Sequence, residues 1–293
     1  MTVIPRDDIP QPKSTRLRSA VHPCHSVNMA VRTLVSFHAH PDDEALLSGG
    51  TLARAAAEGH RVVLVVATDG EAGLAAADAA GADLGRTRSE ELAGAAEAVG
   101  CARVVRLGLP DSGWRQSGAS PEGSFSRLPV ETAAARLIEI LREEQADALT
   151  IYDPAGGYGH PDHRQVHRVG RFAAETVGTP TVLEATLPRE RLHRAVRVAA
   201  ALPGVLDSVD PAAFAQAFTP RRELTHRIDV RAHLAAKRRA MQAHASQATS
   251  DVGPRTLALL LRLPPPVFSL VAGYEWFVQR GREPGRCDDV FAD

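Results

Sequence analysis

The sequence predicts an α/β protein with a Rossmann-like, mostly parallel sheet, helices on both faces of that sheet, and a C-terminal cap region. From residue 31 onwards, short apolar segments alternate with amphipathic segments of helical spacing, and the connections between them are short. Such alternation is typical of doubly wound sheets with right-handed crossovers. Residues 61–68 are apolar throughout their middle, as expected of a parallel strand that is covered on both faces.

Each predicted element follows from a local signal. Gly59 and Gly100 end two of the helices, because glycine readily adopts the conformation that closes a helix. Ala134, Leu137 and Leu141 recur at helical spacing and mark the core-facing side of a third helix. The predicted strands are 34–37, 61–68, 103–107, 148–152, 181–185 and 223–230, and the predicted helices are 44–59, 87–99, 130–145, 162–176 and 231–247.

Three regions are expected along the chain. Residues 1–28 form a disordered leader, residues 29–186 form the α/β catalytic core, and residues 187–293 complete the sheet and cap the active site. The leader has scattered charge and lacks the apolar centre of a signal peptide, and both Met1 and Met29 are compatible with a translation start. Residues 257–274 are apolar but interrupted by charge and by three prolines, so we expect a buried or interfacial element and no membrane span.

The composition narrows the class of partner. A formal net charge of -1 argues against binding nucleic acid through counterion release, so a small-molecule substrate is expected. Cys24, Cys101 and Cys287 are widely spaced and odd in number, which fits a reduced protein of the cytoplasm better than a disulfide scaffold. The first strand is not followed by a GxGxxG sequence, so dinucleotide binding is not expected. The oligomeric state stays open, and a homo-oligomer is compatible with the sequence.

The most informative motif is His40-Pro41-Asp42-Asp43-Glu44, which follows the first predicted strand. Pro41 makes it hard for the strand to continue, so the imidazole and the carboxylates sit at its carboxyl end. Open α/β sheets bind their ligands at that end of the strands. A divalent metal site could begin here.

A second cluster, His160-Pro161-Asp162-His163, follows the predicted strand 148–152. A catalytic zinc typically takes three ligands of the His and carboxylate type and keeps one position open. His40, Asp43 and His163 make such a set. Either cluster alone is usually a turn in which Asp caps the next helix, whereas two of them at strand ends favour a metal site.

Four further motifs stand in order between and after these two clusters. They are Thr68-Asp69-Gly70-Glu71, Arg88-Ser89-Glu90-Glu91, Asp111-Ser112-Gly113 and Ala243-His244-Ala245-Ser246-Gln247. Together with residues 39–44 and 158–163, they resemble the LmbE/PIG-L superfamily of zinc-dependent N-deacetylases, over roughly residues 31–250. That superfamily includes the N-acetylglucosaminyl-phosphatidylinositol deacetylases, the deacetylase and amidase of the mycothiol pathway, and the deacetylases of the bacillithiol pathway.

The resemblance assigns the catalytic roles. It implies that His40, Asp43 and His163 hold the metal, which is expected to be Zn²⁺, with Fe²⁺ as the alternative because a His2Asp set binds either ion. It implies Asp42 as the general base and a protonated His160 as the group that stabilises the oxyanion.

The remaining roles concern support and substrate. Tyr158 would assist at the oxyanion, and Asp162 would orient His160 and keep it charged. Glu71, Arg88 and Asp111 are the expected contacts to sugar hydroxyls or a polar head, whereas the role of His244 stays open.

The leading functional hypothesis is hydrolysis of an N-acyl group, with acetyl expected, from an amino-sugar conjugate. The alternatives are a zinc amidase that cleaves a thiol-sugar conjugate of the mycothiol type, and a non-catalytic sugar-binding module with a structural metal. A structural zinc site is usually closed by four protein ligands, which argues against the module. A metallophosphoesterase is disfavoured because no second set of ligands for a second metal can be assembled.

Overall fold

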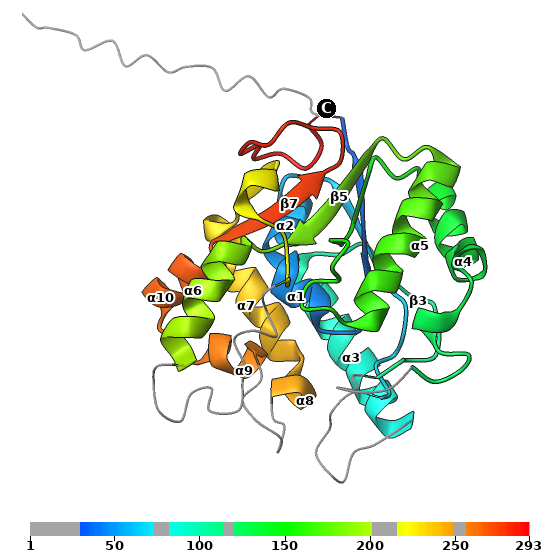
Figure 1. Cartoon of the computed structure of the whole chain (residues 1–293), viewed down its shortest axis with the longest axis horizontal. Coiled ribbons are helices and arrows are strands. Elements are labelled where there is room, and N and C mark those ends of the chain that lie inside the picture. Colours follow the sequence, from blue (N-terminus) through cyan, green and yellow to red (C-terminus); the bar gives the residue numbers. More distant parts are fainter. Residues whose placement is uncertain (1–29, 73–81, 114–119, 201–215, 249–255, 293) are drawn as a thin grey trace, which may run out of the picture. The chain divides into compact units, whose positions relative to one another are not determined.

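The computed structural model describes residues 30–72, 82–113, 120–200, 216–248 and 256–292, so the predicted leader lies outside the described part. Within that part, a 7-stranded sheet has the order β3-β2-β1-β4-β5-β7-β6 (Figure 1). The pairs β3–β2, β2–β1, β1–β4 and β4–β5 are parallel, whereas β7 runs antiparallel to both of its neighbours, β5 and β6. The strands are β1 (Thr33–His38), β2 (Arg61–Val66), β3 (Arg103–Arg106), β4 (Ala148–Tyr152), β5 (Thr181–Thr186), β6 (His226–Asp229) and β7 (Tyr274–Gln279).

Apolar side chains of the central strands alternate between two cores, one on each face of the sheet. Leu34 packs in a core with Leu52 and Met241, whereas its neighbour Val35 belongs to the other core with Leu137. Burial on both faces explains the continuous apolar strands of the sequence. The predicted fold class, α/β with a mostly parallel sheet and helices on both faces, is confirmed.

The helices divide between these two cores. α4 and α5 cover one face of the sheet, and α2, α3 and α7 contribute to the core on the other face (Figure 1). The helices are α1 (Asp43–Leu47), α2 (Gly49–Ala57), α3 (Ala82–Val99), α4 (Val130–Glu143), α5 (Pro161–Val177), α6 (Arg189–Ala200), α7 (Leu234–Ala243), α8 (Ala245–Ala248), α9 (Thr256–Leu261) and α10 (Pro265–Ala272).

The first predicted helix, over residues 44–59, is in fact two helices with a break at Ser48. The hydroxyl of Ser48 lies 3.2 Å from Nε2 of His38, and its φ of -134° is not helical. A new helix, α2, begins after this break because the carboxylate of Glu275, on β7, accepts hydrogen bonds from the backbone N–H groups of Gly50 and Thr51. A long-range cap of this kind leaves no local signal in the sequence.

The C-terminal region differs from the prediction in two further ways. Tyr274–Gln279 forms the strand β7, which the predicted elements do not include and which begins where the apolar stretch 257–274 ends. The predicted helix over residues 231–247 ends at Ala243 and restarts at Ala245. Both β6 and β7 belong to the same sheet as the core strands.

The order of the strands places a switch point between β1 and β4. The chain passes from β1 to β2 on one side, and β4 pairs with β1 on the other. Crevices at such switch points, beyond the carboxyl ends of the strands, are where open α/β sheets bind ligands. The motifs at 39–44 and 158–163 follow these two strands.

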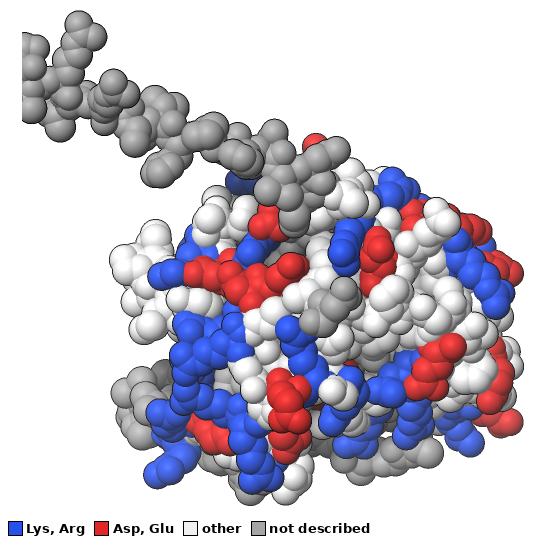
Figure 2. Space-filling view, turned by 90° about the horizontal axis from the view of Figure 1, so that it is seen from above, with Lys and Arg blue, Asp and Glu red and all other residues white. Residues whose placement is uncertain are grey.

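The surface shows no broad region of one sign on the side seen in Figure 2, where acidic and basic side chains lie in small neighbouring groups. Among the described helices, none has the length and apolar character needed to cross a membrane. Cys101 and Cys287, the two cysteines in the described part of the chain, are both free thiols.

Candidate metal and catalytic site

His40 and Asp43 form the first half of the site. Oδ2 of Asp43 accepts a hydrogen bond from the backbone N–H of His40 at 3.1 Å and lies 3.2 Å from Nδ1 of the same residue. Asp43 is the first residue of α1, so its carboxylate also lies at the positive end of that short helix. The local turn after β1 therefore brings the imidazole and the carboxylate together.

His163 supplies the second half from the first turn of α5. Pro161 begins this helix, a position that suits proline because the first N–H groups of a helix have no partner within it. The ring of His163 stacks on Tyr152, with 4.2 Å between centroids and 4° between planes. Its Nε2 lies 3.3 Å from Oδ2 of Asp43, so the structure brings the three predicted ligands together.

These donors fit a metal ion. Nε2 of His163 is buried and makes no hydrogen bond to the described residues, although the carboxylate of Asp43 is within ion-pair distance. A cation shared by the two groups would satisfy both of them. Among the described residues, donor atoms of His40, His160 and His163 lie within 4.8 Å of one another, and so do those of His40, Asp111 and Asp162.

The protonation of the cluster also favours a cation. Burial alone would lower the pKa of His40, but contacts with Asp111, Asp162 and Asp43 raise that pKa well above its usual value. Burial would raise the pKa of Asp43, yet His163 and His40 hold it well below the usual range. Asp43 is therefore a carboxylate at neutral pH, the form that binds metal, and an ion would replace the proton on His40.

Asp42 lies beside this cluster in a strained backbone conformation. Its φ of 111° is in the left-handed region, which a residue other than glycine seldom adopts away from functional sites. Burial raises the pKa of Asp42 to about 6, with Arg88 acting to lower it and Asp43 to raise it. A carboxylate with this pKa can exchange protons near neutral pH.

Arg88 holds the loop that carries Asp42. Its guanidinium donates to the carbonyl oxygens of Gly70 at 2.9 Å and Pro41 at 2.6 Å, and Nη2 lies 3.5 Å from Oδ1 of Asp42. Gly70 has a φ of 70°, and a Cβ there would lie 2.3 Å from the guanidinium. Arg88 is only 3% exposed, so its observed contacts are with these loops, and the predicted contact to substrate stays a prediction.

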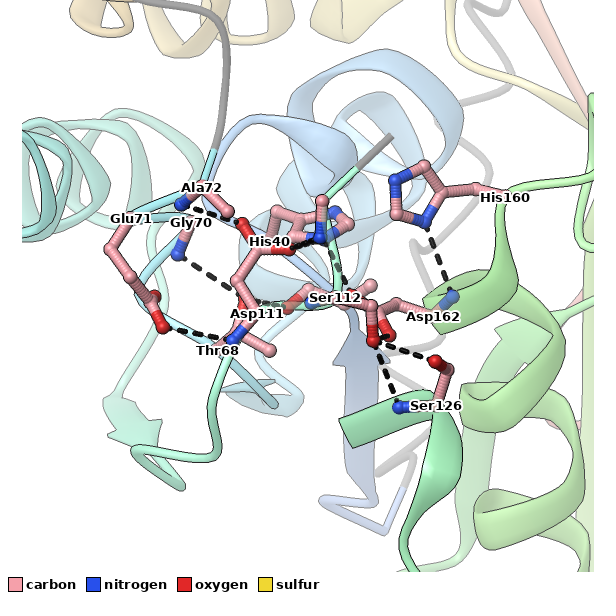
Figure 3. Close-up of polar contacts among 12 residues, drawn as sticks. His40, Thr68, Gly70, Glu71, Ala72, Asp111, Ser112, Ser126, His160 and Asp162 are labelled. Carbon is pink, nitrogen blue, oxygen red and sulfur yellow. Dashed lines mark hydrogen bonds and ion pairs between the residues drawn. The ribbon is translucent and has the colours of Figure 1, made fainter. Parts of the chain in front are cut away.

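Glu71 and Asp111 connect the loop after β2 with the loop after β3 through hydrogen bonds. Oε1 of Glu71 accepts from the backbone N–H of Asp111 at 2.8 Å, and Oδ2 of Asp111 accepts from the N–H of Ala72 at 3.2 Å (Figure 3). The other oxygen of Asp111 lies 3.4 Å from Nε2 of His40. The two predicted substrate residues thus form one wall that reaches the metal cluster.

Asp162 has a different set of contacts from the one predicted. Its carboxylate accepts from the hydroxyl of Ser112 at 2.5 Å and from the backbone N–H of Ser112 at 3.0 Å, and Oδ2 lies 3.3 Å from Nε2 of His40 (Figure 3). Its backbone N–H donates to Nδ1 of His160 at 3.2 Å. The role of Asp162 in orienting His160 stays a prediction.

The surroundings of His160 disfavour its charged form. Nδ1 of His160 accepts the backbone N–H of Asp162 at 3.2 Å and so carries no proton, as an N-cap of α5 must. Burial, together with the nearby His40 and His163, lowers the pKa of His160 to about 3. With Nδ1 as the acceptor, a neutral ring would carry its proton on Nε2, and the expected charge on His160 stays a prediction.

Tyr158 lies at the edge of the cluster. It is 44% exposed, and its ring centroid lies 5.3 Å from that of His163 and 6.1 Å from that of His160. Asp153 shapes this loop, since its carboxylate accepts from the N–H of Gly157 and from two threonine hydroxyls. Sequence reasoning missed Asp153, and its place directly after β4 was the available signal.

His244, whose role the sequence left open, reaches the site through Glu44. Its Nε2 lies 2.6 Å from Oε1 of Glu44, and neither side chain is exposed. The second carboxylate oxygen of Glu44 accepts the backbone N–H of Asp42 at 3.0 Å. The motif at 243–247 therefore connects to the loop of Asp42 over a sequence separation of 200 residues.

Comparison with known proteins identifies the family of the chain. The model of the family described as PIG-L, GlcNAc-PI de-N-acetylase, matches residues 35–174. A 1D-myo-inositol 2-acetamido-2-deoxy-alpha-D-glucopyranoside deacetylase of Streptomyces griseus is 38% identical over 253 residues, which cover 78% of this chain and 78% of the relative.

Solved structures share the fold at lower identity. The N,N'-diacetylchitobiose deacetylase from Pyrococcus horikoshii superposes with a TM-score of 0.51 at 21% identity, covering 85% of this chain and 83% of its own. A 4-carboxy-2-hydroxymuconate hydratase from Pseudomonas putida gives a TM-score of 0.56 at 16% identity, covering 88% of this chain and 99% of its own. Since a hydratase and a deacetylase share it, the fold alone does not decide the reaction.

Fold, site and sequence relatives together define an N-deacetylase. The chain belongs to the PIG-L family, the family of GlcNAc-PI de-N-acetylases, as its six motifs predicted.

Proposed function

We propose that the protein removes the acetyl group from 1D-myo-inositol 2-acetamido-2-deoxy-alpha-D-glucopyranoside, an N-acetylglucosamine joined to a polyol. The observation that carries this proposal is the relative of that name, 38% identical and matched over 78% of both chains. The site supports the chemistry, since a cluster of His and Asp donors stands beside a further carboxylate with a pKa of about 6.

The proposed metal is Zn²⁺, held by His40, Asp43 and His163. Three ligands of this type leave a position open, as catalytic zinc sites do. A divalent cation bound there supplies Lewis-acid polarisation of an amide carbonyl and lowers the pKa of water. The buried Nε2 of His163, which lacks a hydrogen bond to the described residues, supports this assignment.

Asp42 is the proposed general base. With a pKa of about 6, the carboxyl group of Asp42 is mostly ionised at neutral pH, and its protonated form can donate a proton to the leaving amine. Arg88, at 3.5 Å, limits the movement of the carboxylate. One residue can thus carry a proton from water to nitrogen.

His160 is the proposed donor to the oxyanion. Because its Nδ1 accepts a backbone N–H, the neutral ring carries its proton on Nε2 and can donate it as a hydrogen bond. A neutral donor of this kind needs no charged partner, which agrees with the engagement of Asp162 elsewhere. Tyr158, 44% exposed at the edge of the cluster, is the proposed second donor.

The test is release of primary amine and acetate from N-acetylglucosaminyl-inositol by the Zn²⁺-loaded protein, with Asp42→Ala as the control. Equal release by both proteins would refute the assigned base. A parallel incubation with a thiol-sugar conjugate addresses the amidase alternative, and faster cleavage of that conjugate than of the N-acetyl glycoside would favour it.

A further inference from the structure

A pocket of about 630 Å³ lies at the carboxyl ends of β2 and β3 and against α3. Its volume is within the range of roughly 300 to 1,000 Å³ that is typical of small-molecule sites. Asp69 and Glu71, which follow β2, form part of its lining, and Arg106 closes β3 on the other side. None of these side chains takes part in the hydrolysis described above.

The pocket and the metal cluster share a wall. Glu71 lines the pocket and accepts the backbone N–H of Asp111 at 2.8 Å. Asp111 in turn lies 3.4 Å from Nε2 of His40 (Figure 3). A substrate with its acetamide at the cluster therefore has the pocket beside it, with two side chains between them.

The charges of the pocket indicate the chemistry of its ligand. Its lining contains two arginines, Arg86 and Arg106, and three carboxylates, Asp69, Glu71 and Glu90. Each arginine already has a carboxylate partner, at 3.1 Å in both cases. A phosphate would meet excess negative charge here, because both arginines among the described lining residues are already paired with carboxylates.

A neutral polyol matches this surface better. Hydroxyl groups both donate and accept, so adjacent hydroxyls can bind an arginine N–H and a carboxylate oxygen at once. Arg106 offers a suitable arrangement, because its Nη1 lies 3.1 Å from Asp69 and 2.7 Å from the hydroxyl of Ser89 while its side chain stays 47% exposed.

We propose that this pocket is the subsite for the uncharged polyol ring of the substrate, with Arg106 and Asp69 as the residues that select it. The inference rests on the proposed function, and it goes further by stating where the inositol binds. The pocket is expected to prefer an inositol without phosphate.

The kinetic test compares two substrates of the Zn²⁺-loaded enzyme, N-acetylglucosaminyl-inositol and methyl N-acetyl-α-glucosaminide, which has no polyol. Arg106→Ala is expected to raise KM for the first substrate by about tenfold or more, the usual effect of losing a charged hydrogen bond. The kcat for this substrate and the kinetics with the second substrate are expected to stay unchanged. Arg103→Ala is the matched control, because Arg103 lies on the same strand but pairs with Glu143 and Glu144.

A binding measurement separates this inference from the proposed function. Calorimetry with glucosaminyl-inositol and with methyl glucosaminide needs no turnover, and Arg106→Ala should weaken only the first ligand by about tenfold or more. If wild type releases amine from neither glycoside, the proposed function fails, and calorimetry still decides the subsite.

Two results would overturn the subsite. One is an equal effect of Arg106→Ala on both ligands, or no effect on either. The other is tighter binding of a glucosaminyl-inositol that carries a phosphate on the ring than of the neutral compound, since the pocket would then favour anions.

Discussion

Glu44 and His244 form a buried ion pair, 2.6 Å long, that ties the end of α7 to the loop of the proposed base. Contacts with His244 and His38 lower the pKa of Glu44 against the opposing effect of burial, and Glu44 raises the pKa of His244 against the same effect. Both shifts favour the charged forms. The pair thus fixes the carboxylate that accepts the backbone N–H of Asp42.

His244→Ala should destabilise the protein strongly. Removal of one partner leaves the carboxylate of Glu44 buried and unpaired, which typically costs about 3 to 5 kcal/mol. His244→Gln keeps a hydrogen-bond donor and should cost less. Urea unfolding of the metal-free variants measures both values, and equal losses for Ala and Gln would show that a neutral hydrogen-bond donor does not replace the imidazolium.

The activity should fall on the acid side as Asp42 becomes protonated. Because a general base must be ionised, kcat/KM rises with pH up to the pKa of Asp42, about 6 in the metal-free protein, and levels off above it. A cation bound to Asp43 lowers that pKa, so the acid limb of the holoenzyme lies at or below this value.

Asp42→Asn should remove this limb and lower kcat/KM by about 100- to 10,000-fold. A pH–rate profile of the residual activity checks both points. An acid limb that persists unchanged in the variant would assign the titration to another group.

His160→Ala distinguishes an oxyanion donor from a metal ligand. Loss of a donor costs about 100- to 1,000-fold in kcat and leaves the metal in place. A role of His160 as a metal ligand also fits the geometry, because its donor atom lies within 4.8 Å of those of His40 and His163. Metal content after dialysis decides between them, with His163→Ala as the reference for a lost ligand.

Ser112→Ala tests whether Ser112 holds the carboxylate of Asp162, which contacts His40, in place. The hydroxyl of Ser112 donates to that carboxylate at 2.5 Å, and its loss should weaken metal binding by about 10-fold or more, as the loss of groups that support a metal site usually does. Ser126→Ala is the matched control, since Ser126 contacts the hydroxyl of Ser112 and not the carboxylate. Equal metal affinities in the two variants would contradict the assignment.

The core strands and the proximity of His40, Asp43 and His163 could be predicted because their signals are local. Apolar runs such as residues 61–66 define buried strands, and His40 and Asp43 are three residues apart at the end of one of them. His163 joins them from the first turn of α5, directly after the loop that follows β4.

The rest depends on partners that are distant in the chain. The break at Ser48 needs Glu275, which caps α2 from 225 residues away. The contact of the Asp162 carboxylate with Ser112, 50 residues away, leaves no local signal either. The lowered pKa of His160 likewise follows from burial and from neighbouring imidazoles, which the motif does not show.

The most direct test of the account is the rate of amine release from N-acetylglucosaminyl-inositol by the Zn²⁺-loaded protein, measured for wild type, Asp42→Asn and the metal-stripped enzyme. We expect turnover by wild type, a rate at least about 100-fold lower for Asp42→Asn, and no turnover by the stripped enzyme until Zn²⁺ is restored. Turnover by Asp42→Asn at the wild-type rate, or no release of amine by fully metal-loaded wild type, would contradict it.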